Sequence, residues 1–188
     1  MNNQDSFYHR IAPGCAWFQR PTRGLLNSRG ILALDPGLRV GWAFVELPEK
    51  RVEAAGFFEL DRRHLYFNAR KGVLELIELL KPSAVMLEQY FVGGKAHNGQ
   101  SIELRGAMKS AVEGSELPWT EINVSRVRSL MGTKRGMSDC DIREIVADRT
   151  GLPRQYQPDP AKKKVLYYPA DTWDAVALGW AADSVEGL

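Results

Sequence analysis

From about Arg29 onward, the apolar and polar positions of this chain follow two different periods, one typical of strands and one typical of helices. Short apolar runs bounded by turn residues predict strands at 31–34, 40–46, 52–60, 83–87 and 119–124. Apolar positions at helical spacing predict helices at 65–80, 101–113 and 125–131, with two more beginning at Ser138 and Asp171. Three strands followed by alternating helices and strands indicate an α/β protein with a mixed sheet and helices on its faces.

Residues 1–28 differ from the rest of the chain, because they show neither period. Pro13, Gly14, Pro21 and Gly24 interrupt them. We therefore expect an irregular N-terminal extension of unknown role, followed by one domain at 29–188. A chain of 188 residues is long enough for one domain with a sizeable core.

The composition excludes several classes of protein. No apolar run approaches the roughly 18 residues of a membrane span, and the polar start of the chain is not a secretory signal. The two cysteines, Cys15 and Cys140, fit neither a metal spacing nor a disulfide framework. These features predict a protein of the reducing cytoplasm that does not bind membranes.

Charge is nearly balanced overall but uneven along the chain. The formal net charge is +2, whereas residues 121–164 hold 10 Lys or Arg against 6 Asp or Glu. Such a region can attract a phosphate backbone. A solvated basic surface is the alternative interpretation.

Carboxylates stand at three points where a predicted strand ends or a predicted helix begins. Asp35 follows the first strand, Glu88 ends the fourth, and Asp171 and Asp174 open the last helix. Oxygen ligands of this kind suit two divalent cations that hold phosphate oxygens between them. The pattern therefore points to phosphodiester hydrolysis.

Each of these residues also has a structural explanation. Asp35 before Pro36-Gly37 is an ordinary turn residue. Asp171 and Asp174 suit the N-cap and third position of a helix without any metal. Glu88 is harder to explain in this way, because it ends a strand that we expect to be buried. The four together favour a metal site.

The motifs that carry these acids resemble the RuvC family of Holliday-junction resolvases, in the RNase H-like superfamily. The resemblance rests on residues 31–38, on Leu87-Glu88-Gln89 with Phe91, on residues 104–107, and on residues 171–175. It implies an RNase H-like fold with a five-stranded mixed sheet flanked by helices. It also implies that Asp35, Glu88, Asp171 and Asp174 are the catalytic, metal-binding residues.

The resemblance further implies an activity. Two Mg²⁺ ions per active site, or Mn²⁺, would activate a water and stabilise the leaving 3′-oxygen, with Asp35 as the bridging ligand. The products would carry 5′-phosphate and 3′-hydroxyl ends, and no small-molecule cofactor would be needed. A homodimer would supply two active sites for paired symmetric nicks in four-way junction DNA.

Six residues are predicted to contact DNA. Phe91, with Tyr90, is expected to stack on an unpaired base, although either could belong to the core. Arg105 lies in a segment that the resemblance places near the dimer interface and the DNA. Basic residues Arg128, Lys134 and Arg135 are expected to contact phosphates, although the match to the family pattern is imperfect there.

Three alternatives remain open from the sequence. A nuclease of the same superfamily could act on other branched DNA or on RNA. A non-catalytic junction-binding module could have descended from such an enzyme. An actin-like or sugar-kinase-like ATP-binding protein is disfavoured, because no second phosphate loop follows Gly151.

Overall fold

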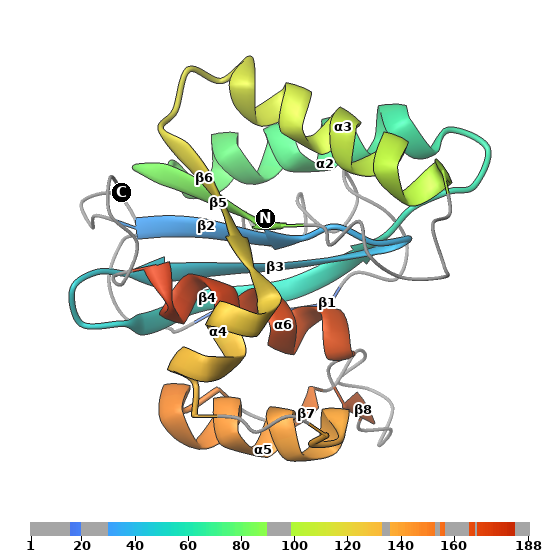
Figure 1. The fold of residues 1–188 in the computed structure, drawn as a ribbon. Coiled ribbons are helices and arrows are strands. Elements are labelled where there is room, and N and C mark those ends of the chain that lie inside the picture. Colours follow the sequence, from blue (N-terminus) through green and yellow to red (C-terminus); the bar gives the residue numbers. More distant parts are fainter. Residues whose placement is uncertain are drawn as a thin grey trace, which may run out of the picture.

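The fold is a mixed β-sheet with helices packed on both faces (Figure 1). The computed structural model describes residues 16–19, 30–89, 99–132, 136–152, 155–156, 166–167 and 169–182. The sheet has six strands in the order β1-β4-β3-β2-β5-β6. Within the described residues, no helix is both long enough and apolar enough to cross a bilayer.

Five of the strands match the five predicted from the sequence. They are β2 (Gly30–Asp35), β3 (Arg39–Glu46), β4 (Arg51–Glu59), β5 (Ala84–Gln89) and β6 (Trp119–Asn123). β2, β3 and β4 form an antiparallel meander, whereas β5 is parallel to β2 and β6 is parallel to β5. The predicted five-stranded mixed sheet is therefore confirmed.

The sixth strand, β1 (Ala16–Gln19), lies in the extension that we expected to be irregular. It pairs with β4 in the antiparallel direction and forms one edge of the sheet. The expectation of an irregular segment is therefore wrong for these four residues. Their strand conformation depends on the free edge of β4, which is far away in sequence.

Alternate side chains of β2 serve two separate hydrophobic cores, which explains why this strand is apolar throughout. Leu32 and Leu34 pack on the face covered by α2 (Leu65–Leu80) and α3 (Gly99–Glu113). Ile31 and Ala33 pack on the opposite face, beneath α6. The two groups of helices lie above and below the sheet in Figure 1.

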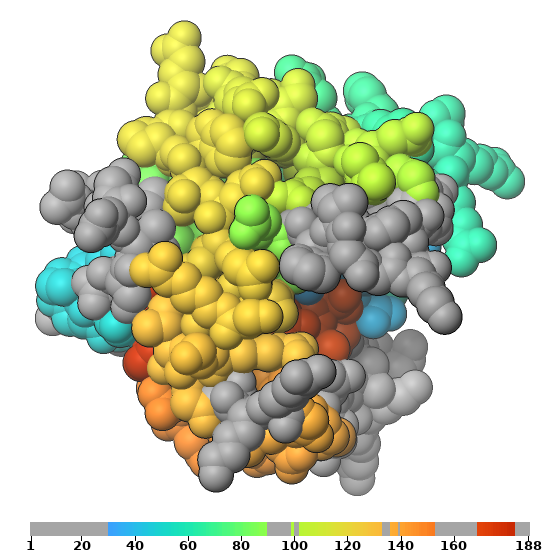
Figure 2. Space-filling model, in the orientation of Figure 1, coloured from blue at the N-terminus to red at the C-terminus, as the bar shows by residue number. Residues whose placement is uncertain are grey.

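Three helices cover the second face. They are α4 (Val124–Leu130), α5 (Asp139–Thr150) and α6 (Ala170–Trp180). α6 lies directly on the sheet and is apolar on almost every side, as predicted, because α4 and α5 pack over it. In Figure 2 only small red parts of α6 are visible, beside α4 (gold) and above α5 (orange).

The ends of these helices follow recognisable chemistry. Ser138 and Asp141 form a capping box at the start of α5, where a helix was predicted to begin, and each side chain accepts a hydrogen bond from the other residue's backbone N–H. α6 begins one residue earlier than expected, with Pro169 as its N-cap. Asp171 is therefore the second residue of α6 rather than its N-cap, and Asp174 is the fifth. Between α5 and α6, β7 (Gln155–Tyr156) and β8 (Leu166–Tyr167) form a small antiparallel pair.

Candidate active site

Asp35 and Glu88 lie side by side because their strands are parallel and in register. Leu34 of β2 is paired with Leu87 of β5, and the two acids are the next residues along. Each side chain is only partly exposed, and the two carboxyl groups are joined by a hydrogen bond. The parallel pairing of β2 and β5 thus brings together two acids that are 53 residues apart in sequence.

Asp171 and Asp174 reach the same end of the sheet from the start of α6. They are three residues apart and therefore lie on one side of the helix. The start of α6 comes very close to β3, since a Cβ added to Gly41 would lie 1.9 Å from the backbone oxygen of Asp171. Gly41 is itself paired with Asp35 across β2 and β3. Because Gly41 has no side chain, the start of α6 can approach β3 and bring Asp171 and Asp174 close to Asp35.

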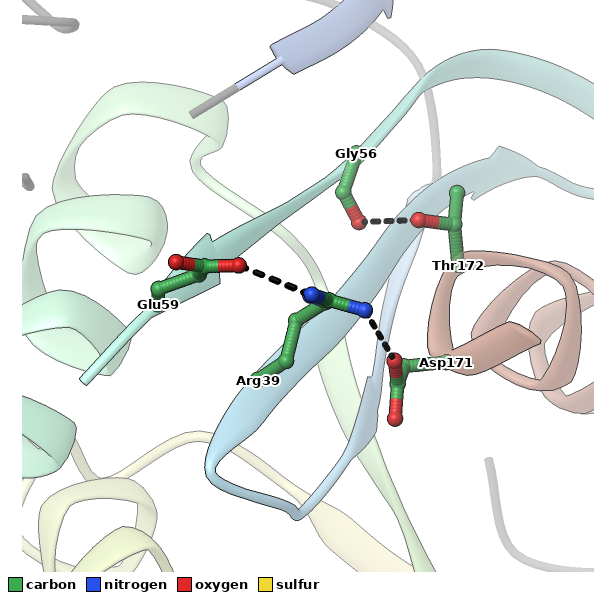
Figure 3. Close-up of polar contacts among 5 residues, drawn as sticks. All are labelled: Arg39, Gly56, Glu59, Asp171 and Thr172. Atoms are coloured by element: carbon green, nitrogen blue, oxygen red, sulfur yellow. Dashed lines mark hydrogen bonds and ion pairs between the residues drawn. The ribbon is translucent and has the colours of Figure 1, made fainter. Parts of the chain in front are cut away.

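A hydrogen bond fixes the start of α6 from its other side. The hydroxyl of Thr172, which is fully buried, donates to the backbone oxygen of Gly56 on β4 at 3.2 Å (Figure 3). The contacts at Gly41 and Gly56 hold the first turn of α6 against two neighbouring strands. Asp171 makes the first of these contacts and precedes the residue that makes the second, so it is positioned by backbone packing as well as by its own side chain.

The electrostatics show that the other three acids act on Asp35. Burial raises the pKa of Asp35 well above its usual range, and the hydrogen bond from Asp35 to Glu88 raises it further. The charges of Glu88, Asp174 and Asp171 add to the effect. Burial also raises the pKa of Asp171, whereas its own backbone N–H and Arg39 oppose that shift. The four predicted carboxylates are therefore gathered at one end of the sheet.

The donor set fits a divalent cation, although these side chains do not enclose one as they are placed. Among the described residues, no group of three or more His, Cys, Asp or Glu side chains stands close enough to hold a metal ion. The donors that gather here are nevertheless all carboxylate oxygens, which Mg²⁺ and Mn²⁺ prefer. A cation among them would offset the repulsion and the burial that raise the pKa of Asp35.

A pocket opens beside this cluster, between the end of β5 and the helices α4, α5 and α6. Glu88 and Asp174 contribute to its wall, together with Arg128 and aliphatic side chains such as Val127. Arg128 is exposed and is the last-turn basic residue of α4. Of the two predicted DNA contacts that the structure describes, Arg105 and Arg128, it is thus Arg128 that lies next to the acids.

Among the other predicted DNA contacts, Arg105 is the one that the structure describes, and it is engaged in an ion pair. The guanidinium of Arg105 forms an ion pair with Glu121 of β6 at 2.7 Å, and its side chain is 14% exposed. This pair holds α3 against β6, and a contact between Arg105 and DNA stays a prediction. Tyr90, Phe91, Lys134 and Arg135 lie outside the described residues.

Arg39 is a residue of the site that sequence reasoning missed. It begins β3, directly after the turn that follows Asp35, and its Nη1 atom lies 3.7 Å from Oδ2 of Asp171 (Figure 3). A signal was present in the sequence, because the first residue of a strand that pairs antiparallel to β2 must lie near the end of β2. The contact with Asp171 depends on α6 and could not be inferred locally.

The chain has relatives among known proteins. No protein-family model matches the chain. The crossover junction endodeoxyribonuclease RuvC of Xanthomonas oryzae pv. oryzae is 28% identical over 140 residues, covering 70% of this chain and 80% of that protein. The same enzyme of Xanthomonas axonopodis pv. citri is 27% identical over 140 residues, which again cover 70% of this chain and 80% of that protein.

Solved structures show the same fold. Thermus thermophilus RuvC superposes with a TM-score of 0.61 at 18% identity, covering 82% of this chain and 96% of that chain. A structure of T. thermophilus RuvC in complex with Holliday junction substrate gives the same TM-score and coverage at 17% identity. The yeast mitochondrial Holliday junction resolvase gives a TM-score of 0.55 at 13% identity, covering 97% of this chain and 87% of that chain. In sequence and in fold, the chain is therefore RuvC-like, with the RNase H-like fold that its motifs predict.

Proposed function

We propose that this protein is a metal-dependent, structure-selective endodeoxyribonuclease that resolves four-way DNA junctions. The observation that carries the proposal is the gathering of Asp35, Glu88, Asp171 and Asp174 at one end of the sheet. The similarity to enzymes named crossover junction endodeoxyribonuclease supports the choice of substrate. We assign the catalytic role to these four residues.

The same four side chains would hold the metal, with Asp35 at the centre because the other three carboxylates all act on it. Bound Mg²⁺ or Mn²⁺, as a pair of ions, would lower the pKa of a water and stabilise the leaving 3′-oxygen. The protein's part is to orient the carboxylates and to place the DNA, and a bound cation would keep Asp35 ionised. Cleavage would leave 5′-phosphate and 3′-hydroxyl ends.

DNA placement would fall to residues around this end of the sheet. Arg128, exposed beside Glu88 and Asp174, is suited to contact a phosphate next to the scissile one. Lys134 and Arg135 follow α4 in sequence and would extend the basic surface. Tyr90 and Phe91 follow β5 and would stack on an unpaired base at the junction centre.

The active form would be a homodimer. A four-way junction is resolved by nicks in two opposite strands, and a two-fold symmetric dimer presents two identical active sites to them. One chain carries one set of four carboxylates, so a second chain is needed for the paired nicks.

Cleavage of a labelled, immobile four-way junction in Mg²⁺ tests the proposal. We expect paired symmetric nicks in the junction, no cleavage of a linear duplex of the same sequence, and no cleavage by Asp35→Asn. Equal cleavage of both substrates would remove the junction assignment. Tight junction binding without cleavage in either Mg²⁺ or Mn²⁺ would instead support a non-catalytic junction-binding module.

The second candidate is a nuclease of the same fold that acts on other branched DNA or on RNA. Carboxylates at this end of the sheet serve any phosphodiester, so the site by itself does not separate these substrates. Flaps, three-way junctions and RNA–DNA hybrids belong in the same assay for that reason. Faster cleavage of one of these than of the four-way junction would favour this candidate.

A further inference from the structure

Arg39 is held in place by two residues of β4, the neighbouring strand of its hairpin. Its Nε and Nη2 atoms both donate to Oε1 of Glu59, at 3.1 and 2.8 Å. Its guanidinium also lies over the ring of Phe57, 5.4 Å from the ring centre. Glu59 is exposed and its side chain contacts Arg39 rather than the catalytic acids. The guanidinium therefore has a defined direction, and Nη1 is the atom left to face Asp171.

The two oxygens of Asp171 face different partners. Oδ2 lies 3.7 Å from Nη1 of Arg39. Oδ1 lies on the side of the turn after Asp35, 3.7 Å from where a Cβ of Gly37 would stand. Because Arg39 contacts Oδ2, Oδ1 stays directed toward the turn that follows Asp35. Figure 3 shows Arg39 lying between Glu59 and Asp171 in this way.

We propose that Arg39 is a positioning residue for Asp171. Glu59 and Phe57 fix the guanidinium, the guanidinium holds Oδ2, and Oδ1 is thereby kept available for a cation bound with Asp35. Outer contacts of this kind orient metal ligands in many metalloproteins. The inference rests on the proposed function, because it assumes a divalent cation among the four carboxylates.

Charge alone predicts the opposite effect, which makes the inference testable. A guanidinium near the site repels a cation, so a role through charge means that Arg39→Gln binds metal more tightly. A positioning role means that Arg39→Gln binds metal more weakly, because Asp171 is then free to turn. Arg39→Lys keeps the charge but loses the forked contact with Glu59, and should not restore the wild-type affinity.

The test is direct binding of Mn²⁺ to the protein without DNA, measured by calorimetry or electron paramagnetic resonance. We expect about a tenfold weaker affinity in Arg39→Gln and a smaller loss in Glu59→Gln. Because Glu59 acts through Arg39, adding Glu59→Gln to Arg39→Gln should cause no further loss. Arg51→Gln is the matched control, since Arg51 pairs with Glu46 and Glu53 at the far end of the same hairpin.

Two further measurements separate positioning from other roles. The melting temperature of metal-free Arg39→Gln should stay within about 4 °C of wild type, because exposed ion pairs add little stability. Junction binding without metal should also be unchanged. Weaker metal-free junction binding with normal Mn²⁺ affinity would make Arg39 a phosphate contact and overturn the inference.

The failure of this inference can be told apart from failure of the proposed function. If Arg39→Gln binds Mn²⁺ as tightly as wild type, while Asp35→Asn loses the ion and cleavage, only the role of Arg39 is wrong. If wild type and Asp35→Asn bind Mn²⁺ equally and neither cleaves a junction, both proposals are overturned.

Discussion

Asp35 is surrounded by three other carboxyl groups and partly shielded from water, and both conditions favour its protonated form. A residue needed only for stability would not be kept in such a setting, because its ionised form weakens the fold. This conflict between stability and charge is typical of functional sites. At the scale of single residues, it is the clearest sign that the cluster serves chemistry.

The raised pKa of Asp35 predicts a pH dependence of stability in the metal-free protein. Above its ordinary pKa of 3.8, the unfolded chain releases a proton that the folded chain retains. The free energy of unfolding therefore falls as pH rises from about 4, by at most about 1.4 kcal/mol per pH unit from this group. Urea denaturation in EDTA at several pH values measures this slope. It should be reduced in Asp35→Asn, and an unchanged slope would contradict the account.

Addition of Mg²⁺ should offset the repulsion between the carboxylates around Asp35. We expect millimolar Mg²⁺ to raise the melting temperature of the wild-type protein, because only the folded state brings the carboxylates together. Asp35→Asn should melt at a higher temperature than wild type in EDTA and gain less from Mg²⁺. Thermal denaturation with and without Mg²⁺ measures both. The proposed site would be contradicted if Asp35→Asn melted at a lower temperature than wild type in EDTA and its melting temperature rose as much as that of wild type with Mg²⁺.

Single residues also show where the sequence was informative. The positions of Asp35 and Glu88 at strand ends could be predicted because each ends a run of apolar residues. Arg39, Thr172 and Gly41 could not be predicted in their roles, since each depends on where α6 meets the sheet. Such contacts join segments about 130 residues apart, and no local pattern records them.

At the scale of elements, the position of α6 decides the geometry of the site. Gly41 and Gly179 let the helix lie close to β2 and β3, since a Cβ at Gly179 would stand 2.6 Å from a methyl of Val45. The helix pattern was predictable from its apolar residues, but its first residue was not. Pro169 takes the N-cap position that we had assigned to Asp171, and this frees Asp171 from capping.

Gly41→Ala tests the importance of this close approach. The added methyl would meet the backbone of Asp171, so the start of α6 must move and take Asp171 and Asp174 with it. We expect a loss of about 1–3 kcal/mol of stability and at least tenfold slower junction cleavage. Chemical denaturation and initial cleavage rates measure the two effects.

Gly106→Ala is the matched control for stability. Gly106 lies within α3, and a Cβ there has no neighbour within 4 Å. Alanine should therefore be neutral or stabilise the helix by up to about 1 kcal/mol. If Gly41→Ala were tolerated as well as Gly106→Ala, the packing of α6 would not be what positions the acids.

At the scale of the whole molecule, the fold was predictable, but the edge strand β1 was not. The order of strands and helices specified the five-stranded core of the sheet, because short connections and parallel crossovers leave few arrangements. β1 was missed because residues 16–19 form a strand only against the free edge of β4. The proposed homodimer is likewise a property that the order of elements within one chain does not reveal.

Mixed dimers test whether two active sites act together. A dimer with one wild-type and one Asp35→Asn subunit should nick one strand of a junction and leave the opposite strand intact. Differently tagged subunits, co-purified and assayed with both strands labelled, give this measurement. Paired nicks from the mixed dimer, or full activity from a species whose mass is that of one 21.1 kDa chain, would contradict the dimer.

The central claim is that four carboxylates form one cation-dependent centre for junction cleavage. We would measure junction binding in EDTA and junction cleavage in Mg²⁺ for four variants with neutral side chains of similar shape. These variants are Asp35→Asn, Glu88→Gln, Asp171→Asn and Asp174→Asn. The account predicts that all four bind the junction at least as tightly as wild type and that each loses cleavage by about a thousandfold or more. If the wild-type protein cleaves the junction and any of the four variants keeps its rate, that residue is not part of the centre; if all four keep it, the centre lies elsewhere.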